Sequence, residues 1–155
     1  MSTTSTQFSA PYAIATAAAV SGAINALING AIQWYLLAGH EALPLTVDGI
    51  TNDEHTVFGA AVPLAVSLAM ILTAVAYTTV KAPKPAFYPT FLWLVVKHGF
   101  FTLGILVTFA VLWQRILGSI TVSLLVAVVI LGLVAGLAGG IVNYMTIRAA
   151  TERTP

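Results

Sequence analysis

The chain has 155 residues, of which 59% are hydrophobic and only 7% are charged, and its mean hydropathy is +0.96. A soluble domain carries about 25% charged residues, so this composition excludes an ordinary water-soluble globule and predicts an integral membrane protein. The net charge of +1 indicates no basic nucleic-acid-binding surface, and the absence of cysteine excludes disulfides and thiolate metal sites.

Four apolar segments follow one another along the chain, and each exceeds the roughly 20 residues that a membrane helix needs. They cover residues 11–37, 54–80, 88–114 and 119–148. A loop of residues 38–53 and a shorter loop of residues 81–87 separate them. The sequence therefore predicts a single transmembrane domain over residues 1–155, an all-α bundle of four helices with short loops and antiparallel neighbours.

The first segment carries a stripe of polar residues at four-residue spacing: Ser21, Asn25, Asn29 and Gln33. Side chains four apart share one face of a helix, and amides at membrane depth must face protein or water. One interpretation is a hydrated path or a binding site for a polar ligand. The alternative is hydrogen bonding between helices, at about 0.6 kcal/mol per bond.

Small residues form a second row on the first segment, and glycines recur at the same spacing on the fourth. The two rows are Ala18, Gly22, Ala26 and Gly30, and Gly132, Gly136 and Gly140. Small residues at this spacing let helix backbones approach closely in lipid. The rows form either an interface between copies of the chain or a seam of the first helix on the fourth. Two such rows exceed what one internal seam needs, which favours a homo-oligomer.

The second segment is expected to begin at about Glu54, and the capping-box spacing of Thr51 and Glu54 predicts a helix start in this region. Gly118 and Ser119 predict a tight connection before the fourth segment. Basic residues gather at one side of the spans, with Arg115 alone on the other: Lys81, Lys84, Arg148 and Arg153. The positive-inside rule therefore places both termini in the cytoplasm, in an inner or plasma membrane.

The third segment holds two ionisable residues well inside a predicted span, Lys97 and His98. Such residues are candidates for function. Lys97 either extends its ammonium toward the membrane surface or joins a polar cluster with Ser21, Asn25 and Asn143. His98 is expected to be a core histidine with a hydrogen-bond partner near Thr102, and haem or metal ligation is the less favoured alternative.

Two further histidines, His40 and His55, lie near the two ends of the loop of residues 38–53. A metal site shared with Asp48, Asp53 or Glu54 is an alternative there, but no tight ligand spacing indicates it. No nucleophile–base pair or phosphate-binding loop occurs, so no catalytic residue, metal site or cofactor is predicted.

These residues together favour a homo-oligomeric channel or transporter-like protein that binds or passes a small ion or solute, an anion if Lys97 faces inward. Its expected partners are the lipid bilayer and further copies, with another membrane protein as a further candidate, and no nucleic acid is expected. The alternative function is a non-catalytic structural or accessory subunit of a larger membrane complex.

Overall fold

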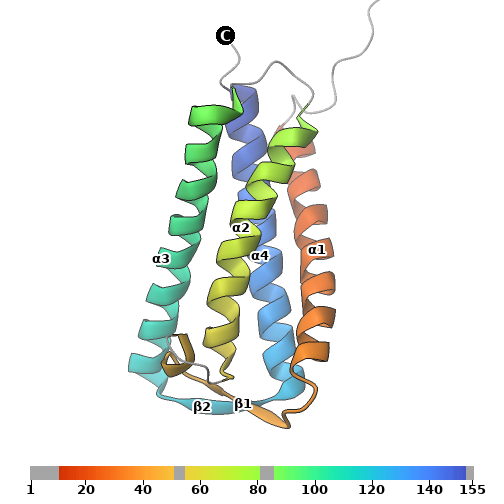
Figure 1. Cartoon of the computed structure of the whole chain (residues 1–155). Helices are drawn as coiled ribbons and strands as arrows, with labels where there is room; N and C mark the ends of the chain where they lie inside the picture. The colour runs from red at the N-terminus through yellow and green to blue at the C-terminus, as the bar shows by residue number, and fades with distance from the viewer. Residues whose placement is uncertain (1–10, 51–54, 81–85, 153–155) are drawn as a thin grey trace, which may run out of the picture.

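The computed structural model describes residues 11–50, 55–80 and 86–152. It consists mainly of four long helices (Figure 1): α1 (Pro11–Leu36), α2 (Val57–Thr79), α3 (Leu92–Leu117) and α4 (Leu124–Glu152). Each helix is long and apolar enough to cross a membrane. The prediction of an all-α membrane protein with four spans is therefore confirmed.

The helices form an open arrangement in which α2 and α4 are central (Figure 1). α4 packs against both α1 and α2, whereas α3 packs mainly against α2. Consecutive helices run antiparallel, as predicted, and the central α2 and α4 run in the same direction. α1 and α3 consequently lie at opposite edges.

Specific residues fix the helix ends. The hydroxyl of Thr56, the N-cap of α2, accepts a hydrogen bond of 3.0 Å from the Gly59 N–H, which satisfies one of the free N–H groups of the first turn. α2 therefore begins three residues after the expected start near Glu54, and the expected capping box over residues 51–54 lies outside the described residues. α3 follows a single turn, η2 (Phe87–Phe91), and ends at Leu117. Its C-cap residue is Gly118, whose φ of 74° favours glycine.

A two-stranded sheet closes one end of the molecule, which we call the sheet end. Strand β1 (Ala42–Leu45) pairs antiparallel with β2 (Ile120–Ser123), with Ala42 opposite Ser123 and Leu45 opposite Ile120. A short 3-10 turn, η1 (Asp48–Ile50), follows β1. The sequence did not predict this sheet, and the expectation that the fourth helix begins at Ser119 is wrong because β2 occupies its first residues. The opposite end, where α1 begins and α4 ends, is the terminal end.

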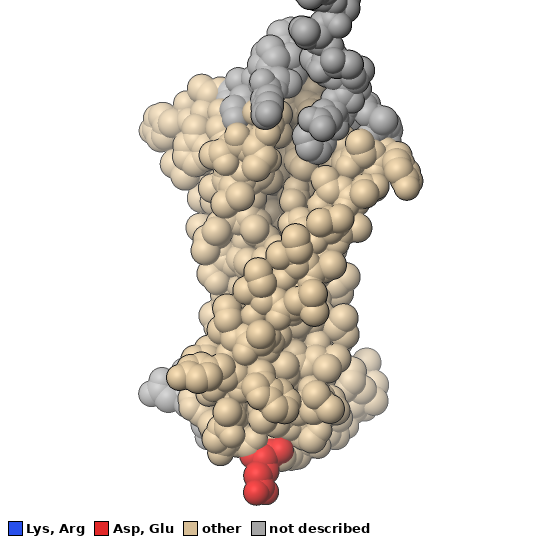
Figure 2. Space-filling model, turned by 90° about the vertical axis from the view of Figure 1, so that its right-hand side faces the viewer, with Lys and Arg blue, Asp and Glu red and all other residues tan. Residues whose placement is uncertain are grey.

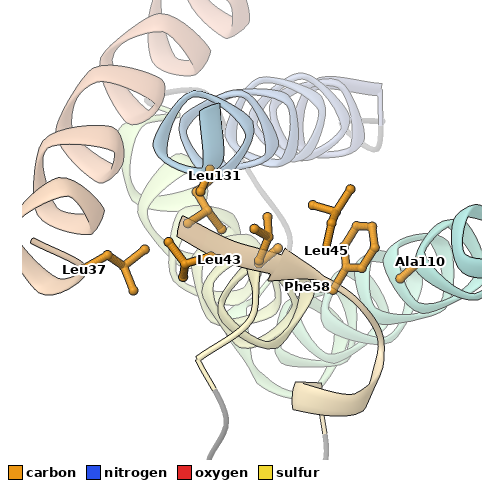
Figure 3. Close-up of a cluster of buried hydrophobic side chains, with 9 residues drawn as sticks. Leu37, Leu43, Leu45, Phe58, Ala110 and Leu131 are labelled. Atoms are coloured by element: carbon orange, nitrogen blue, oxygen red, sulfur yellow. The ribbon is translucent and has the colours of Figure 1, made fainter. Parts of the chain in front are cut away.

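Hydrophobic clusters hold each end together. At the sheet end, Leu43 and Leu45 of β1 point into the helices and meet Phe58 of α2 and Leu131 of α4 (Figure 3). At the terminal end, Tyr77 of α2 stacks on Phe91 with ring centroids 4.0 Å apart. The sheet is thus anchored by side chains as well as by its backbone hydrogen bonds.

The surface agrees with a membrane location. The side of the molecule over α1 shows no basic surface among the described residues, and its acidic surface is confined to the sheet end (Figure 2). Exposed aromatic side chains lie at both ends: Trp34 and Tyr35 near the sheet end, and Tyr12, Tyr88 and Trp93 near the terminal end. Aromatic residues are enriched where a membrane meets water.

Candidate functional site

The amide stripe (Ser21, Asn25, Asn29 and Gln33) faces the interior. Asn29 and Gln33 are 9% and 8% exposed, and Asn25 and Ser21 are half-buried. Asn25 approaches Gly139 of α4 so closely that a Cβ at that glycine would lie 3.2 Å from the Asn25 Nδ2 and 3.1 Å from Leu72 of α2. The stripe therefore points to where α1, α2 and α4 meet.

The hydrogen bonds of the stripe stay within its own helix. Asn25 Nδ2 donates to the Ser21 carbonyl at 2.8 Å, and Asn29 Nδ2 donates to the Asn25 carbonyl at 2.9 Å. These carbonyls also accept the regular backbone bonds of an α-helix. Each of these two amide nitrogens thus has a carbonyl acceptor in its own helix, and neither bond joins two helices.

The two rows of small residues meet within one chain and form what we call the small-residue seam. A Cβ at Gly22 would lie 2.8 Å from the Gly136 carbonyl oxygen, and a Cβ at Gly132 would lie 3.0 Å from that of Ala26. The remaining members, Ala18, Gly30 and Gly140, continue the seam. The backbones of α1 and α4 thus approach as closely as the GxxxG spacing allows. Of the two alternatives for the small-residue rows, the structure forms the packing of the first helix on the fourth within one chain. The preference for a homo-oligomer therefore loses the observation on which it rested.

A groove runs along the outside of this seam. It has a volume of about 520 Å³ and is lined by Ala15, Ala19 and Ala23 of α1 and by Leu133, Leu137 and Ile141 of α4, among others. All six side chains are exposed. We call it the α1–α4 groove. The sequence does not single out the alanine row of this groove, because alanine is frequent on every face of α1.

Lys97 lies on the exposed surface of α3 and not in the bundle interior. Its Nζ is 5.9 Å from the ring centroid of Trp93, one turn closer to the terminal end. Together with Pro89, Thr90 and Leu94, these two residues line a surface pocket of about 320 Å³. This geometry matches the alternative in which the ammonium extends toward the membrane surface.

The structure does not form the polar cluster expected around Lys97. α1 and α3 lie at opposite edges, so Ser21 and Asn25 face α4 while Lys97 is exposed on α3. Asn143 is one turn beyond Gly139 and therefore lies near the level of Ser21 on the antiparallel α1. Within the described chain, its buried Oδ1 has no hydrogen-bond partner, and neither has the Oγ1 of Thr146 beside it on α4.

His98 is 3% exposed and joins α3 to α2. Its Nδ1 lies 2.8 Å from the Oγ1 of Thr73, which is fully buried, and that oxygen lies 2.7 Å from the Ala69 carbonyl oxygen. If the single hydroxyl hydrogen goes to Ala69, as back-bonding in helices favours, His98 donates from Nδ1. The expected partner near Thr102 is thus replaced by Thr73, which the sequence could not indicate because helix order was open.

The side-chain amide of Gln114 forms the hydrogen bonds between α3 and the sheet end. Gln114 Oε1 accepts a hydrogen bond from the Val47 N–H at 2.6 Å and lies 3.0 Å from Thr46 Oγ1. Thr46 Oγ1 also lies 2.8 Å from the Asp48 carboxylate. This network fixes the segment after β1 to the end of α3, a role that the sequence did not predict for Gln114.

His40 and His55 come together near the sheet end, with ring centroids 4.8 Å apart and ring planes 79° apart. Asp48 belongs to the Gln114 network, and Asp53 and Glu54 lie outside the described residues. Across the described ranges, no group of three or more metal-ligating side chains converges. The pair is an edge-to-face aromatic contact that links the two ends of the loop.

The chain was compared with known protein families, with curated proteins and with solved structures, and none of them matches it.

Proposed function

We propose that this chain is a non-catalytic membrane subunit that assembles with further copies of itself through the α1–α4 groove. The groove supports this proposal because its floor is the small-residue seam and its α1 wall is the alanine row Ala15, Ala19 and Ala23. Exposed small residues at four-residue spacing let an incoming helix approach closely, and such packing drives helix association in lipid.

The interior of one chain gives little support to a conduit. The nitrogens of Asn25 and Asn29 are already bonded to carbonyls of α1, and the seam leaves no space between the α1 and α4 backbones. Transport by a single chain would require these groups to release their present partners. An assembly of copies is the simpler role for this surface.

Binding of a small polar solute is the second candidate, and one observation favours it. The buried Asn143 Oδ1 and Thr146 Oγ1 have no partner among the described residues. Buried polar atoms are normally hydrogen-bonded, so an oxygen without a protein partner indicates water or a ligand. A polar solute that donates hydrogen bonds would meet two acceptors there, near the terminal end.

Cysteine cross-linking tests the proposed assembly, because the natural chain has no cysteine. We expect Ala19→Cys to form a disulfide-linked dimer in native membranes under mild oxidation. Ile28→Cys, on an exposed part of α1 outside the groove and on the other side of the helix from Ala19, is the matched control and is expected to remain monomeric. Equal yields at both positions, or no dimer from Ala19→Cys, would contradict the proposal.

A mass measurement distinguishes the occupants of the groove. Ala19→Leu should shift the assembly toward monomer in mild detergent, while far-UV circular dichroism stays unchanged because Ala19 is exposed. Co-purification of a second protein in fixed ratio, lost in this variant, would instead assign the groove to a different subunit.

Flux measurements test transport independently. We expect liposomes with the protein to show no ion or solute flux above protein-free liposomes. If flux is present and falls in Asn143→Leu while the assembly mass is unchanged, the solute-binding candidate replaces the assembly role.

We also propose that the terminal end faces the cytoplasm. Lys81, Lys84, Arg148 and Arg153 belong to this end in the chain order of the spans, and Arg115 belongs to the other. Single cysteines at Gly39 and at Thr151 should react with a membrane-impermeant maleimide from opposite sides of sealed cells. Labelling of Thr151→Cys from outside would reverse the orientation.

A further inference from the structure

One face of α3 is uncovered and has a charged end and an apolar end. α3 packs mainly against α2, so this face is open along much of the helix. Its charged end is the pocket of about 320 Å³ beside Lys97 and Trp93. A second hollow, of about 540 Å³, follows toward the sheet end and includes Phe101, Gly104 and Thr108. We call the two hollows together the α3 lipid face.

Among the side chains that the structure describes, no carboxylate balances the charge of Lys97. Within the described chain, its ammonium has one recorded interaction, the contact with the Trp93 ring. The carboxylates whose side chains the structure describes, Glu41 and Asp48, both lie at the sheet end. A lysine in lipid without a counter-charge is costly, so an anion from outside the chain would stabilise it.

The depth of Lys97 suits a lipid phosphate. α3 has 26 residues, about 39 Å at roughly 1.5 Å per residue, against a hydrocarbon core of about 30 Å. Lys97 is the sixth residue of α3, so its Cα lies only about 3 Å inside the hydrocarbon core if the helix is centred. The side chain extends toward Trp93, and this places the ammonium at the headgroup level.

The second hollow suits an acyl chain. A Cβ at Gly104 would meet no atom within 4 Å, so the glycine leaves a gap in the surface of α3. Phe101, one turn before it, and Leu112, two turns after it, are about half exposed and form apolar borders. The gap lies on the sheet-end side of Lys97, where the chains of a lipid with its phosphate at Lys97 would run.

We propose that the α3 lipid face binds one anionic phospholipid from the leaflet at the terminal end. The Lys97 ammonium donates a hydrogen bond to the lipid phosphate, and one acyl chain lies in the gap at Gly104. An anionic lipid is favoured over a zwitterionic one because no described carboxylate shares the site. This inference stands apart from the proposed assembly, which uses the opposite edge of the bundle.

Tryptophan quenching tests the proposal, because the chain has three tryptophans and only Trp93 lies at this site. In the variant Trp34→Phe/Trp113→Phe, all emission comes from Trp93. The protein is reconstituted in phosphatidylcholine vesicles with a small fraction of brominated phosphatidylglycerol or brominated phosphatidylcholine. We expect about fivefold tighter apparent binding of the anionic lipid, which corresponds to about 1 kcal/mol per basic residue near the membrane surface.

Matched variants identify the groups responsible. Lys97→Gln should reduce the ratio of the apparent affinities for the anionic and the zwitterionic lipid to about one. Lys97→Arg should keep this ratio, and Arg115→Gln at the sheet end should leave it unchanged. Gly104→Leu should weaken quenching by both brominated lipids, since it fills the gap without meeting other atoms. Far-UV circular dichroism verifies that each variant is folded.

Two results would overturn the proposal. One is equal quenching of the Lys97 protein by the two lipids, and the other is a preference that persists in Lys97→Gln. Added inorganic phosphate should not compete, because the gap at Gly104 holds the acyl chain. Full competition by phosphate would assign the pocket to a soluble anion and contradict the lipid assignment.

Discussion

The two edge helices are attached to the central pair by different means. α1 lies on α4 through the small-residue seam, where a Cβ added at Gly22, Gly132, Gly136 or Gly140 would lie 2.8–3.2 Å from a backbone oxygen of the other helix. α3 lies on α2 through side chains: Met70 occupies the space above Gly99, and His98 bonds Thr73. The attachment of α1 depends on close backbone packing. The attachment of α3 depends on side-chain packing, which includes the contact of Phe58 with Phe109 at a ring-centroid distance of 6.3 Å, and on one polar contact.

This difference has a physical consequence in lipid. Without a hydrophobic drive between helices, association depends on close packing and on hydrogen bonds, which are worth about 0.6 kcal/mol on average and up to about 1.7 kcal/mol. A backbone-to-backbone seam cannot adapt to an added atom, whereas a methionine side chain can move. We therefore expect α1 to be sensitive to small substitutions and α3 to tolerate them.

The largest effect is expected for Gly136→Leu in the seam. A Cβ at this position would lie 2.9 Å from the Ala26 Cβ and 3.0 Å from the Gly22 carbonyl oxygen, so the helices must separate. We expect a loss of about 3 kcal/mol or more in the free energy of unfolding, at the upper end for overpacking. Unfolding in mixed detergent micelles measures it. Gly104→Leu, which meets no atom within 4 Å, is the control, and an equal loss there would refute the seam's special role.

A smaller effect is expected for Thr73→Val in the α2–α3 contact. This change keeps the shape of the side chain and leaves the buried Nδ1 of His98 without its partner. The expected loss is about 1–2 kcal/mol, because a buried polar group becomes unsatisfied. Thr73→Ser keeps the hydroxyl and should retain most of the stability. If both variants behave alike, the hydrogen bond does not hold α3 in place.

The same substitution at two glycines compares the attachments directly. Gly22→Ala places its methyl group against the Gly136 backbone, and Gly99→Ala places it against the movable end of Met70. We expect Gly99→Ala to cost under about 1 kcal/mol and Gly22→Ala to cost about 1–3 kcal/mol. Melting temperatures measured in one detergent rank the two variants. The reverse order would show that the contact of α3 with α2 is the more rigid one.

The smallest effect is expected for Asn25→Ala in the amide stripe. Its Nδ2 bonds a carbonyl of its own helix, so the change removes packing against Gly139 but no hydrogen bond between helices. We expect a change below about 1 kcal/mol in the same unfolding measurement. A loss of several kcal/mol would mean that the stripe holds helices together after all.

The sequence predicted the four helices because each apolar run is long enough to span and is bounded by polar or turn residues. It also predicted which side of α1 faces the interior, since Asn29 and Gln33 can be tolerated in a span only away from lipid. Both predictions depend on local composition, which a single sequence displays directly.

The features that the sequence did not predict depend on contacts between residues far apart in the chain. β1 and β2 are 75 residues or more apart, β1 contains Pro44, and the apolar residues of β2 run on into α4. Hydropathy therefore could not separate β2 from the helix. Helix order was also undetermined, so Lys97 could not be assigned to the interior or the surface, and Thr73 could not be recognised as the partner of His98.

Labelling of neighbouring positions on α1 tests the central claim that the amide stripe is turned away from lipid. Ile28 is 54% exposed and Asn29 is 9% exposed, although they are adjacent in the chain. We expect a lipid-soluble probe that forms a carbene on illumination, and therefore needs no thiolate, to label Ile28 and to leave Asn29 largely unlabelled in native membranes. Equal labelling of the two positions would contradict the interior described for this bundle.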